Sequence, residues 1–375
     1  MRDSKTNTHW GEPPWRIDFH PASRPVPEEV DFAVVGGGFT GLSTAAWLRR
    51  LEPLKSVALF EASSLGAGSS GYTGGITLAE TAAGDLPGLG DVLAGFSDAL
   101  REFAVDCDLT LPGVWELERS AGFPHSPSPI SWTDSGELRA ARQVPGGTVD
   151  PGKLVSGLAR AAEGLGAQIF ENARVENVEF HEPLRLNVRG SVLRAQNVLW
   201  ATNAMSLELS DLARRAQPKF TLAVATEPLA GAQCAALGLE SGKPFYTIDF
   251  PYLWGRQIPT GGVIFGSGLV HLGDWRELAD LDIAAGEAAE LIARLEHRIH
   301  ALHPVLHHVK FTHRWGGPIL IAEQWRPVFA QHSRGPRALV LGGYSGHGVA
   351  LSVYLGRWAA EAMLGRRALP DWASV

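Results

Sequence analysis

The sequence has few cysteines and no concentration of positive charge. Its 375 residues include only two cysteines, Cys107 and Cys234, which excludes a disulfide scaffold and is typical of a reducing compartment. Lysine and arginine total 33 against 40 acidic residues, so the formal net charge is −7, and no run of these cations exceeds two residues. Because nucleic-acid binders usually carry a basic stripe, no nucleic-acid partner is expected.

The sequence also lacks a targeting signal and a long apolar run. Residues 1–29 contain no apolar core and are expected to form an extended arm, whose Trp10, Trp15 and Phe19 could pack on this chain or on a partner. Residues 338–356 carry no formal charge, but their five glycines and one histidine favour a buried strand, loop and helix over a bilayer span. We expect a cytoplasmic protein without a membrane span.

Apolar residues and glycine are plentiful. The composition is 45% hydrophobic and 19% charged, which is ordinary for a soluble protein and excludes an intrinsically disordered chain. The length predicts two domains, or one large domain with an insertion. The 43 glycines indicate backbone that approaches a ligand closely.

A glycine motif stands between the first predicted strand and the first predicted helix. Asp31–Val35 is an apolar run typical of a buried parallel strand, and Leu42–Leu51 has helical character. Between them lies Gly36-x-Gly38-x-x-Gly41. Its first glycine permits a tight turn, its second lets backbone approach a pyrophosphate, and its third allows close packing of strand and helix.

An acidic residue completes this pattern at the end of the second predicted strand. Ser56–Phe60 is followed by Glu61, whose carboxylate can accept hydrogen bonds from ribose hydroxyls and would repel a 2′-phosphate. The alternative is a glycine-rich turn with a chance surface glutamate. The order of strand, motif, helix and strand favours a dinucleotide site.

The order of the remaining elements predicts the domain organisation. Asp150 as N-cap and Pro151 at the first helical position predict a helix that runs to about Glu163. The chain ends with another strand and helix, at Ala338–Leu341 and Gly348–Leu364, and antiparallel signals lie between. We predict an α/β fold (α+β overall) with a discontinuous Rossmann-like domain and an inserted antiparallel-sheet substrate domain. The Rossmann-like domain comprises residues 30–110, 145–215 and 310–375, and the inserted domain residues 111–144 and 216–309.

Further segments resemble the FAD-dependent amine and amino-acid oxidoreductases, a family that includes D-amino acid oxidase, glycine oxidase, sarcosine oxidase and γ-glutamylputrescine oxidase. Gly66–Gly75 resembles the family's glycine-rich loop, and Val149–Lys153 with Ala173–Val175 resembles its mid-chain block. Ala201–Ala204 is similar to its second adenine-side strand end. Gly342–Ser352 is similar to its C-terminal flavin motif, closest to the γ-glutamylputrescine oxidase type. The resemblance implies FAD as the cofactor.

The C-terminal motif also has a physical interpretation of its own. Its glycines leave backbone N–H groups uncovered before an apolar helix, a nest that favours the negative charge of a reduced flavin. The alternative is a turn that only packs. His347, inside the motif, is either a proton donor or acceptor at the flavin or a packed residue whose backbone matters more, and the second interpretation is favoured.

The motifs and the resemblance together define the residues expected to bind FAD: Gly36, Gly38, Phe39, Thr40, Gly41, Glu61, Ala62, Ser69, Ser70, Thr73, Gly74, Gly75, Val175, Thr202, Asn203, Gly343, Tyr344, Gly346, His347, Gly348 and Val349. Covalent attachment in the family uses a cysteine that would fall near Trp315–Pro318 or, in some dehydrogenase relatives, a histidine that would fall near Tyr72. Neither place offers one, so the FAD is predicted to be non-covalent.

The substrate side is predicted from residues 249–257, which lead into a strand of the inserted sheet. Strand alternation would point Tyr252, Trp254 and Arg256 the same way, so that two aromatic rings surround an amine and a guanidinium holds a carboxylate. The alternative is a solvent-facing sheet edge. Tyr252, Arg256 and His347 are the candidate catalytic residues.

Two departures from the sarcosine oxidases limit the substrate and the acceptor. The lysine that binds the substrate carboxylate in those enzymes corresponds to Ala350 here, and the strand around Gly262–Gly268 lacks the lysine that helps oxygen react. Both departures argue against sarcosine as the substrate. The second leaves open whether oxygen is the acceptor.

No metal site is predicted. The histidines between His297 and His313 are close in sequence, but Pro304 interrupts their helix and no cysteine or carboxylate set completes a coordination sphere. Asp106, Cys107 and Asp108 have no histidine nearby in sequence that would make a nucleophile.

The expected reaction is oxidation of the C–N bond of a primary or secondary amine or an amino acid. Hydride would pass to flavin N5, the imine would be hydrolysed, and oxygen or another acceptor would reoxidise the flavin. Three alternatives stand beside it. They are a dehydrogenase that reacts poorly with oxygen, a non-catalytic FAD-binding or assembly protein, and an NAD-dependent dehydrogenase that leaves the later glycine-rich segments unexplained.

Overall fold

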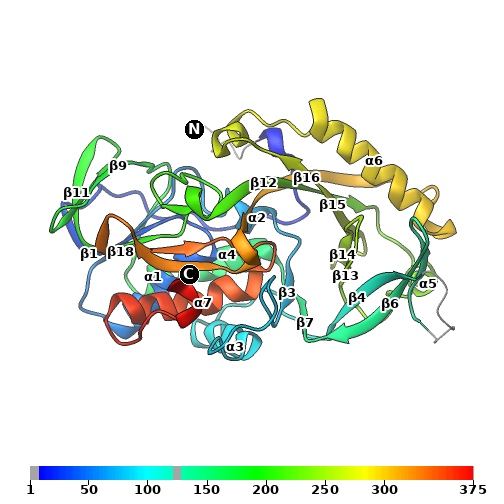
Figure 1. Cartoon of the computed structure of the whole chain (residues 1–375), viewed down its shortest axis with the longest axis horizontal. Coiled ribbons are helices and arrows are strands. Elements are labelled where there is room, and N and C mark those ends of the chain that lie inside the picture. Colours follow the sequence, from blue (N-terminus) through cyan, green and yellow to red (C-terminus); the bar gives the residue numbers. More distant parts are fainter. Residues whose placement is uncertain (1–7, 121–127, 375) are drawn as a thin grey trace.

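The computed structural model describes residues 8–120 and 128–374. Residues 1–7 of the expected arm and residues 121–127 of the expected inserted domain lie outside the described residues. Two eight-stranded sheets dominate the described part of the chain. Figure 1 shows them toward opposite ends of the long axis, with β12 and β16 running between the two parts.

The first sheet has its centre at a buried parallel strand. Its strands are β1 (Glu29–Val35), β2 (Val57–Phe60), β8 (Gln168–Phe170), β9 (Val175–Glu179), β10 (Leu184–Val188), β11 (Ser191–Trp200), β17 (Val328–His332) and β18 (Gly335–Gly342). The order is β17-β18-β11-β1-β2-β8, and β9 and β10 extend from β11 as an antiparallel pair. Strand β1 pairs in parallel with β11 and β2, as the predicted Rossmann-like arrangement requires.

Helices pack against this sheet and bring the two ends of the chain together. They are α1 (Phe39–Leu51), α4 (Pro151–Gly164) and α7 (Gly348–Met363), and α3 (Val92–Glu102) packs on α7. Ser43 of α1 donates its hydroxyl to the Val353 carbonyl of α7 at 2.8 Å. Helix α4 begins as predicted, because the Asp150 carboxylate accepts the Lys153 N–H at 2.9 Å and Pro151 occupies the first turn.

The second sheet is mostly antiparallel and has its own aromatic core. Its strands are β4 (Val114–Ser120), β5 (Ser131–Thr133), β6 (Glu137–Val144), β12 (Ala216–Thr226), β13 (Phe245–Thr247), β14 (Trp254–Gln257), β15 (Val263–His271) and β16 (Phe311–Ala322), in the order β16-β12-β15-β14-β13-β4-β6-β5. Trp132, Phe245 and Phe265 are buried and in mutual contact in this core. Helices α5 (Gly231–Ala236) and α6 (Gly286–Leu302) accompany the sheet.

One strand does not follow the predicted division. Strand β16 lies within residues 310–375, which are expected in the Rossmann-like domain, yet it pairs along its length with β12 of the second sheet. The expected boundary at residue 310 therefore does not separate the two sheets. Strand β16 returns the chain from the second sheet to β17 of the first.

Short elements complete the described part of the chain. Strands β3 (Ile76–Leu78) and β7 (Gly146–Thr148) pair with each other, and α2 (Ser69–Tyr72) lies in the glycine-rich loop. Short 3-10 helices occur at Thr8–Trp10, Leu212–Arg214, Trp275–Ala279, Pro304–Leu306, Glu323–Trp325 and Asp371–Ser374. Within the described ranges, no helix combines the length and the apolar character needed to cross a membrane.

The described part of the N-terminal arm packs on its own chain. Trp10 is 1% exposed, and its indole donates to the Leu278 carbonyl at 3.0 Å. Trp15 donates in the same way to the Gly71 carbonyl at 2.7 Å. Of the two arrangements that the sequence leaves open for these tryptophans, the structure has the intramolecular one.

Candidate functional site

A cavity of about 1230 Å³ lies between the two sheets. The first sheet contributes the glycine turn after β1 and the carboxyl ends of β2 and β11, and the second sheet contributes residues of β12, β13, β14, β15 and β16. Pockets for single small molecules usually measure 300–1,000 Å³. This cavity therefore has room for a large cofactor and a substrate together.

The glycine turn forms one end of the cavity, and each of its three glycines is required for a different structural reason. Gly36 has φ +117°, and a Cβ there would stand 2.4 Å from the carbonyl oxygen that follows β11. A Cβ on Gly41 would stand 1.9 Å from the Gly36 oxygen, so the third glycine lets α1 start against the turn. Gly38 is the N-cap of α1 and offers no side chain to cap it. The helix N-terminus, a favourable place for a phosphate, therefore faces the cavity at Phe39 and Thr40.

Glu61 lies beside this turn, at the end of β2. Its two carboxylate oxygens accept the Gly37 N–H at 2.8 Å and the Ser63 N–H at 2.9 Å. Burial raises the pKa of Glu61 and outweighs these backbone hydrogen bonds, which act to lower it. A carboxylate has about four acceptor positions, so Glu61 keeps the capacity to accept ligand hydroxyls. Ala62 and Val175 line the cavity next to it.

Four segments that are distant in sequence meet around Ser69 of α2. Its hydroxyl donates to the Pro318 carbonyl of β16 at 2.7 Å and accepts from the Asn203 amide at 2.9 Å. The Asn203 side-chain oxygen in turn accepts the Gly343 N–H at 3.0 Å. These bonds fix the glycine-rich loop, the end of β11, strand β16 and the C-terminal motif relative to one another.

The C-terminal motif docks on the first glycine motif and carries an unpartnered polar atom. Tyr344 and Thr40 share a hydroxyl–hydroxyl hydrogen bond of 2.7 Å. His347 precedes α7 and lines the cavity, and burial lowers the pKa of its imidazole. Its Nδ1 is buried and has no hydrogen-bond partner. The same is true of the hydroxyl of Thr202, which also lines the cavity. Because buried polar atoms are normally hydrogen-bonded, a ligand bound in the cavity would supply the partner that both atoms lack.

Aromatic side chains form the wall that the second sheet contributes. The Trp254 ring packs against Gly74 and Gly266. A Cβ added to Gly74 would lie 2.1 Å from this ring and one added to Gly266 would lie 2.0 Å from it, so only glycine leaves room for the ring at these two positions. Tyr252 precedes β14 in a loop and is 41% exposed, and burial of its hydroxyl within the cavity raises its pKa to about 12. Tyr246 of β13 lines the cavity and donates its hydroxyl to Glu116 at 2.5 Å.

Arg256 lies behind this wall. It points to the same side as Trp254, as predicted, but its guanidinium donates to the Gly74 and Gln257 carbonyls and stacks over Trp15, 5.8 Å from the ring centroid. Arg256 is 4% exposed and does not line the cavity. Burial lowers its pKa to about 10. This placement does not support the expected contact between Arg256 and a substrate carboxylate, because backbone carbonyls already occupy the guanidinium.

The cavity gathers most of the sequence-predicted residues. Among the predicted residues, only Gly41, Gly75, Gly343 and Arg256 do not line it. The lining also contains residues that the sequence reasoning missed: His9, Trp10, Gly37, Tyr72, Thr221, His271 and Trp325. Gly37 and Tyr72 lie inside the two glycine-rich segments that the sequence marks, whereas the other five lie in the arm or in strands and loops of ordinary composition, where no local signal marks them.

A family comparison agrees with this geometry. Residues 31–362 match the family model described as FAD dependent oxidoreductase. The match covers most of the chain, and the chain belongs to this family of FAD-dependent oxidoreductases, which act on amines or amino acids. The predicted family is confirmed.

The chain is also similar to individual proteins and to a solved structure. The chain is 26% identical to a probable oxidoreductase OrdL of Haemophilus influenzae, over 90% of this chain and 84% of that protein. It is 25% identical to the gamma-glutamylputrescine oxidoreductase of Escherichia coli, over 89% of this chain and 84% of that protein. The glycine oxidase structure from Geobacillus kaustophilus shares the fold, with a TM-score of 0.73, 20% identity, and coverage of 92% of this chain and 98% of that one.

The residues present fit FAD. The Phe39 N–H of α1 already donates to the Ser70 hydroxyl at 3.0 Å. The rest of that helix N-terminus, the side-chain-free turn at Gly36 and the unpartnered Thr202 and His347 atoms suit a ligand with phosphates, hydroxyls and a polar ring. No group of three or more metal-ligating side chains is present within residues 8–120 and 128–374.

Proposed function

We propose that the chain oxidises the C–N bond of a primary or secondary amine, or of an amino acid. The observation that carries this proposal is the single cavity that joins the glycine turn and the C-terminal motif to an aromatic wall of a different sheet. When bound, FAD would supply the hydride acceptor for the carbon that bears the amine. Water then hydrolyses the resulting imine.

The residues of the chain would orient the substrate and exclude water from it. Trp254, held against Gly74 and Gly266, and Tyr246, held by Glu116, offer aromatic faces at fixed positions. Such faces attract the protonated form of an arriving amine. Positioning of this kind supplies much of the rate enhancement in many enzymes.

His347 and Arg256 take different roles in this proposal. The substrate amine must be deprotonated before hydride leaves, and the unpartnered Nδ1 of a neutral His347 can accept a proton there. Arg256 holds the Gly74 carbonyl and so positions the loop beside the cavity. We propose it as a positioning residue and no longer as a ligand for the substrate carboxylate.

The electron acceptor is oxygen or another carrier. Val263, Ile264 and Phe265 of β15 are fully buried and apolar where the sarcosine oxidases are expected to carry a lysine. This strand favours the dehydrogenase as the second candidate function.

We propose that the FAD is bound non-covalently. Both cysteines are buried, and neither lines the cavity. Acid precipitation should therefore release the flavin into the supernatant. The division of the chain into a Rossmann-like and a substrate domain and the cytoplasmic location stay predictions.

Anaerobic titration of the holoenzyme tests the proposed function. The test compounds are glycine, L-proline, putrescine and γ-glutamylputrescine, because similar proteins are named for some of them. Bleaching of the flavin absorbance by any of these amines supports the proposal, and peroxide formed on admitting air would identify an oxidase. A flavin that none of them or a wider amine panel bleaches would overturn it in favour of a non-catalytic FAD-binding protein.

A further inference from the structure

Three large side chains of one loop project into the cavity from the second sheet. Ile248, Phe250 and Tyr252 alternate along the loop between β13 and β14, and all three line the cavity. They are 55%, 83% and 41% exposed. Exposed apolar residues are usually scattered singly on a protein surface, so three in five residues at one cavity indicate a recognition surface.

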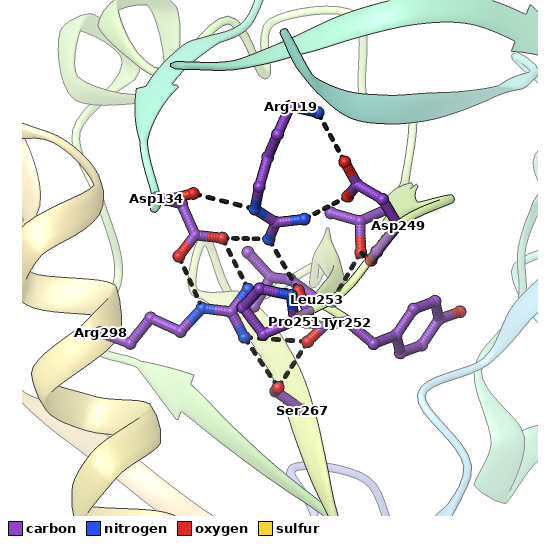
Figure 2. Close-up of polar contacts among 9 residues, drawn as sticks. Arg119, Asp134, Asp249, Pro251, Tyr252, Leu253, Ser267 and Arg298 are labelled. Atoms are coloured by element: carbon purple, nitrogen blue, oxygen red, sulfur yellow. Dashed lines mark hydrogen bonds and ion pairs between the residues drawn. The ribbon is translucent and has the colours of Figure 1, made fainter. Parts of the chain in front are cut away.

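The backbone of this loop is held by two arginines of the second sheet and its helix. The Pro251 carbonyl accepts from Arg119 at 2.7 Å and from Arg298 at 2.8 Å. The next carbonyl, that of Tyr252, accepts from Arg298 at 2.9 Å and from the Ser267 hydroxyl at 2.5 Å. Figure 2 shows both guanidinium groups converging on these carbonyls, while the Tyr252 ring points away from them.

A buried carboxylate holds the two arginines in place. The Asp134 side chain is 4% exposed and accepts from Arg298 at 2.9 and 2.6 Å and from Arg119. Burial acts to raise the pKa of Asp134, but hydrogen bonds from Arg298 and Arg119 outweigh it and lower the pKa. Asp249, inside the loop, pairs with Arg119 as well. Two cations and two anions therefore balance in this cluster, which we call the arginine clamp (Arg119, Asp134, Asp249 and Arg298).

The arginine clamp connects elements that are far apart in sequence. Arg119 lies on β4, Asp134 follows β5, and Arg298 lies on α6. Charge-assisted hydrogen bonds are the strong ones, and breaking a partly buried ion pair is more costly than breaking an exposed one. The loop conformation is thus fixed by tertiary contacts. Both guanidinium groups donate to carbonyls of the loop and to the carboxylates of Asp134 or Asp249.

We infer that the apolar and aromatic side chains of Ile248, Phe250 and Tyr252 form a recognition surface for the hydrocarbon part of the amine substrate, and that Arg119 and Arg298 are positioning residues for it. This inference rests on the proposed function, since it names what part of the substrate that same cavity recognises. The arginines act on the substrate only through the loop.

Hydrogen exchange of the holoenzyme tests the clamp without any substrate. Three amides of the loop are hydrogen-bonded: Thr247 to the Leu253 carbonyl, Ile248 to the Leu117 carbonyl, and Leu253 to the Thr247 hydroxyl. In Arg298→Gln these amides should exchange at least about tenfold faster, while α1 is unchanged.

The matched control is Arg294→Gln, one turn earlier on α6. Arg294 is 74% exposed and pairs only with Glu290 among the contacts of the described chain, so loop exchange should stay as in the wild type. Ser267→Ala removes one donor to the Tyr252 carbonyl and tests the clamp if Arg298→Gln does not fold. Loop exchange unchanged in both Arg298→Gln and Ser267→Ala would overturn the positioning role.

Anaerobic flavin reduction tests the recognition surface, using the amine that bleaches the wild-type flavin. Phe250→Ala alters a side chain that is 83% exposed, so folding and FAD content should be retained. Its half-saturating amine concentration should rise about tenfold with the limiting rate within about threefold. Arg298→Gln should show the same split.

The outcomes separate this inference from the proposed function. An unchanged half-saturating concentration in Phe250→Ala would overturn the recognition surface while leaving the proposed function intact. If no amine bleaches the wild-type flavin, the proposed function fails and the recognition role fails with it, whereas the hydrogen-exchange result still decides the clamp.

Discussion

The contact between Tyr246 and Glu116 gives a prediction whose size can be worked from the structure. Both side chains are buried, at 8% and 3% exposure, and the phenol donates to the carboxylate at 2.5 Å. Tyr246→Phe removes this donor while keeping the ring, so no cavity forms. A hydrogen bond to a charged group contributes roughly 1.5–3 kcal/mol, and we expect Tyr246→Phe to lower the free energy of unfolding by about that amount.

A double-mutant cycle isolates the pair. Arg142 also donates to Glu116, at 3.2 Å, but its side chain is 67% exposed and can be hydrated instead. Combining Tyr246→Phe with Glu116→Ala, which leaves the phenol no acceptor, should therefore give a coupling energy of roughly 1.5–3 kcal/mol at neutral pH. Urea unfolding followed by circular dichroism, at a fixed saturating FAD concentration, measures it.

The coupling should depend on pH in a defined direction. Burial acts to raise the pKa of Glu116, but hydrogen bonds from Arg142 and Tyr246 outweigh it, so the pKa in the folded protein is lowered. A carboxyl with a lowered folded pKa stabilises the protein above its unfolded pKa, near 4.3, and loses this contribution as the pH falls through the folded value. A coupling energy below about 0.5 kcal/mol at neutral pH, which is the usual additivity error, would refute this reasoning.

Three further predictions concern the glycine turn, the arm and a buried thiol. Gly41→Ala should weaken FAD binding by at least about tenfold by equilibrium dialysis, because its Cβ would lie 1.9 Å from the Gly36 oxygen, whereas Gly164→Ala, which has nothing within 4 Å and does not line the cavity, is the control; equal affinities would contradict this. Trp10→Ala should lower the free energy of unfolding by about 3–5 kcal/mol, and a loss under about 1 kcal/mol would mean that the arm is not docked. Burial raises the pKa of Cys107 to about 12, so iodoacetamide at pH 8 should modify it only after unfolding; rapid labelling of the native protein would disprove this.

The features that could be predicted from sequence depend on neighbours along the chain. Asp150 and Pro151 specify the start of α4 through contacts within one helical turn. The Gly36–Gly41 turn, likewise, is specified by backbone conformation and by carbonyls close to it in the fold. Such local requirements leave a readable pattern, and the structure has both features where the sequence predicts them.

The features that could not be predicted depend on distant partners. Residues 311–322 contain two glycines and a proline, which disfavour a strand, and they become β16 only because β12 pairs with them. Arg256 faces the side that strand alternation predicts. Its guanidinium is nevertheless buried behind the cavity wall, because it donates to the carbonyl of Gly74 in another segment. The arginine clamp assembles from β4, the turn after β5, the Asp249 loop and α6, and none of these segments carries a local signal of that meeting.

The packing of the N-terminal arm has a consequence for the order in which the chain folds. Trp10 and Leu278, which share a hydrogen bond, are 268 residues apart, and Gly11 bridges to Trp315 of β16. At roughly 5–20 residues per second of synthesis, the arm emerges on the order of tens of seconds before its docking surface exists. The cavity wall formed by His9 and Trp10 can therefore close only after β16 has paired, so this part of the ligand site forms late in synthesis although its residues are made first.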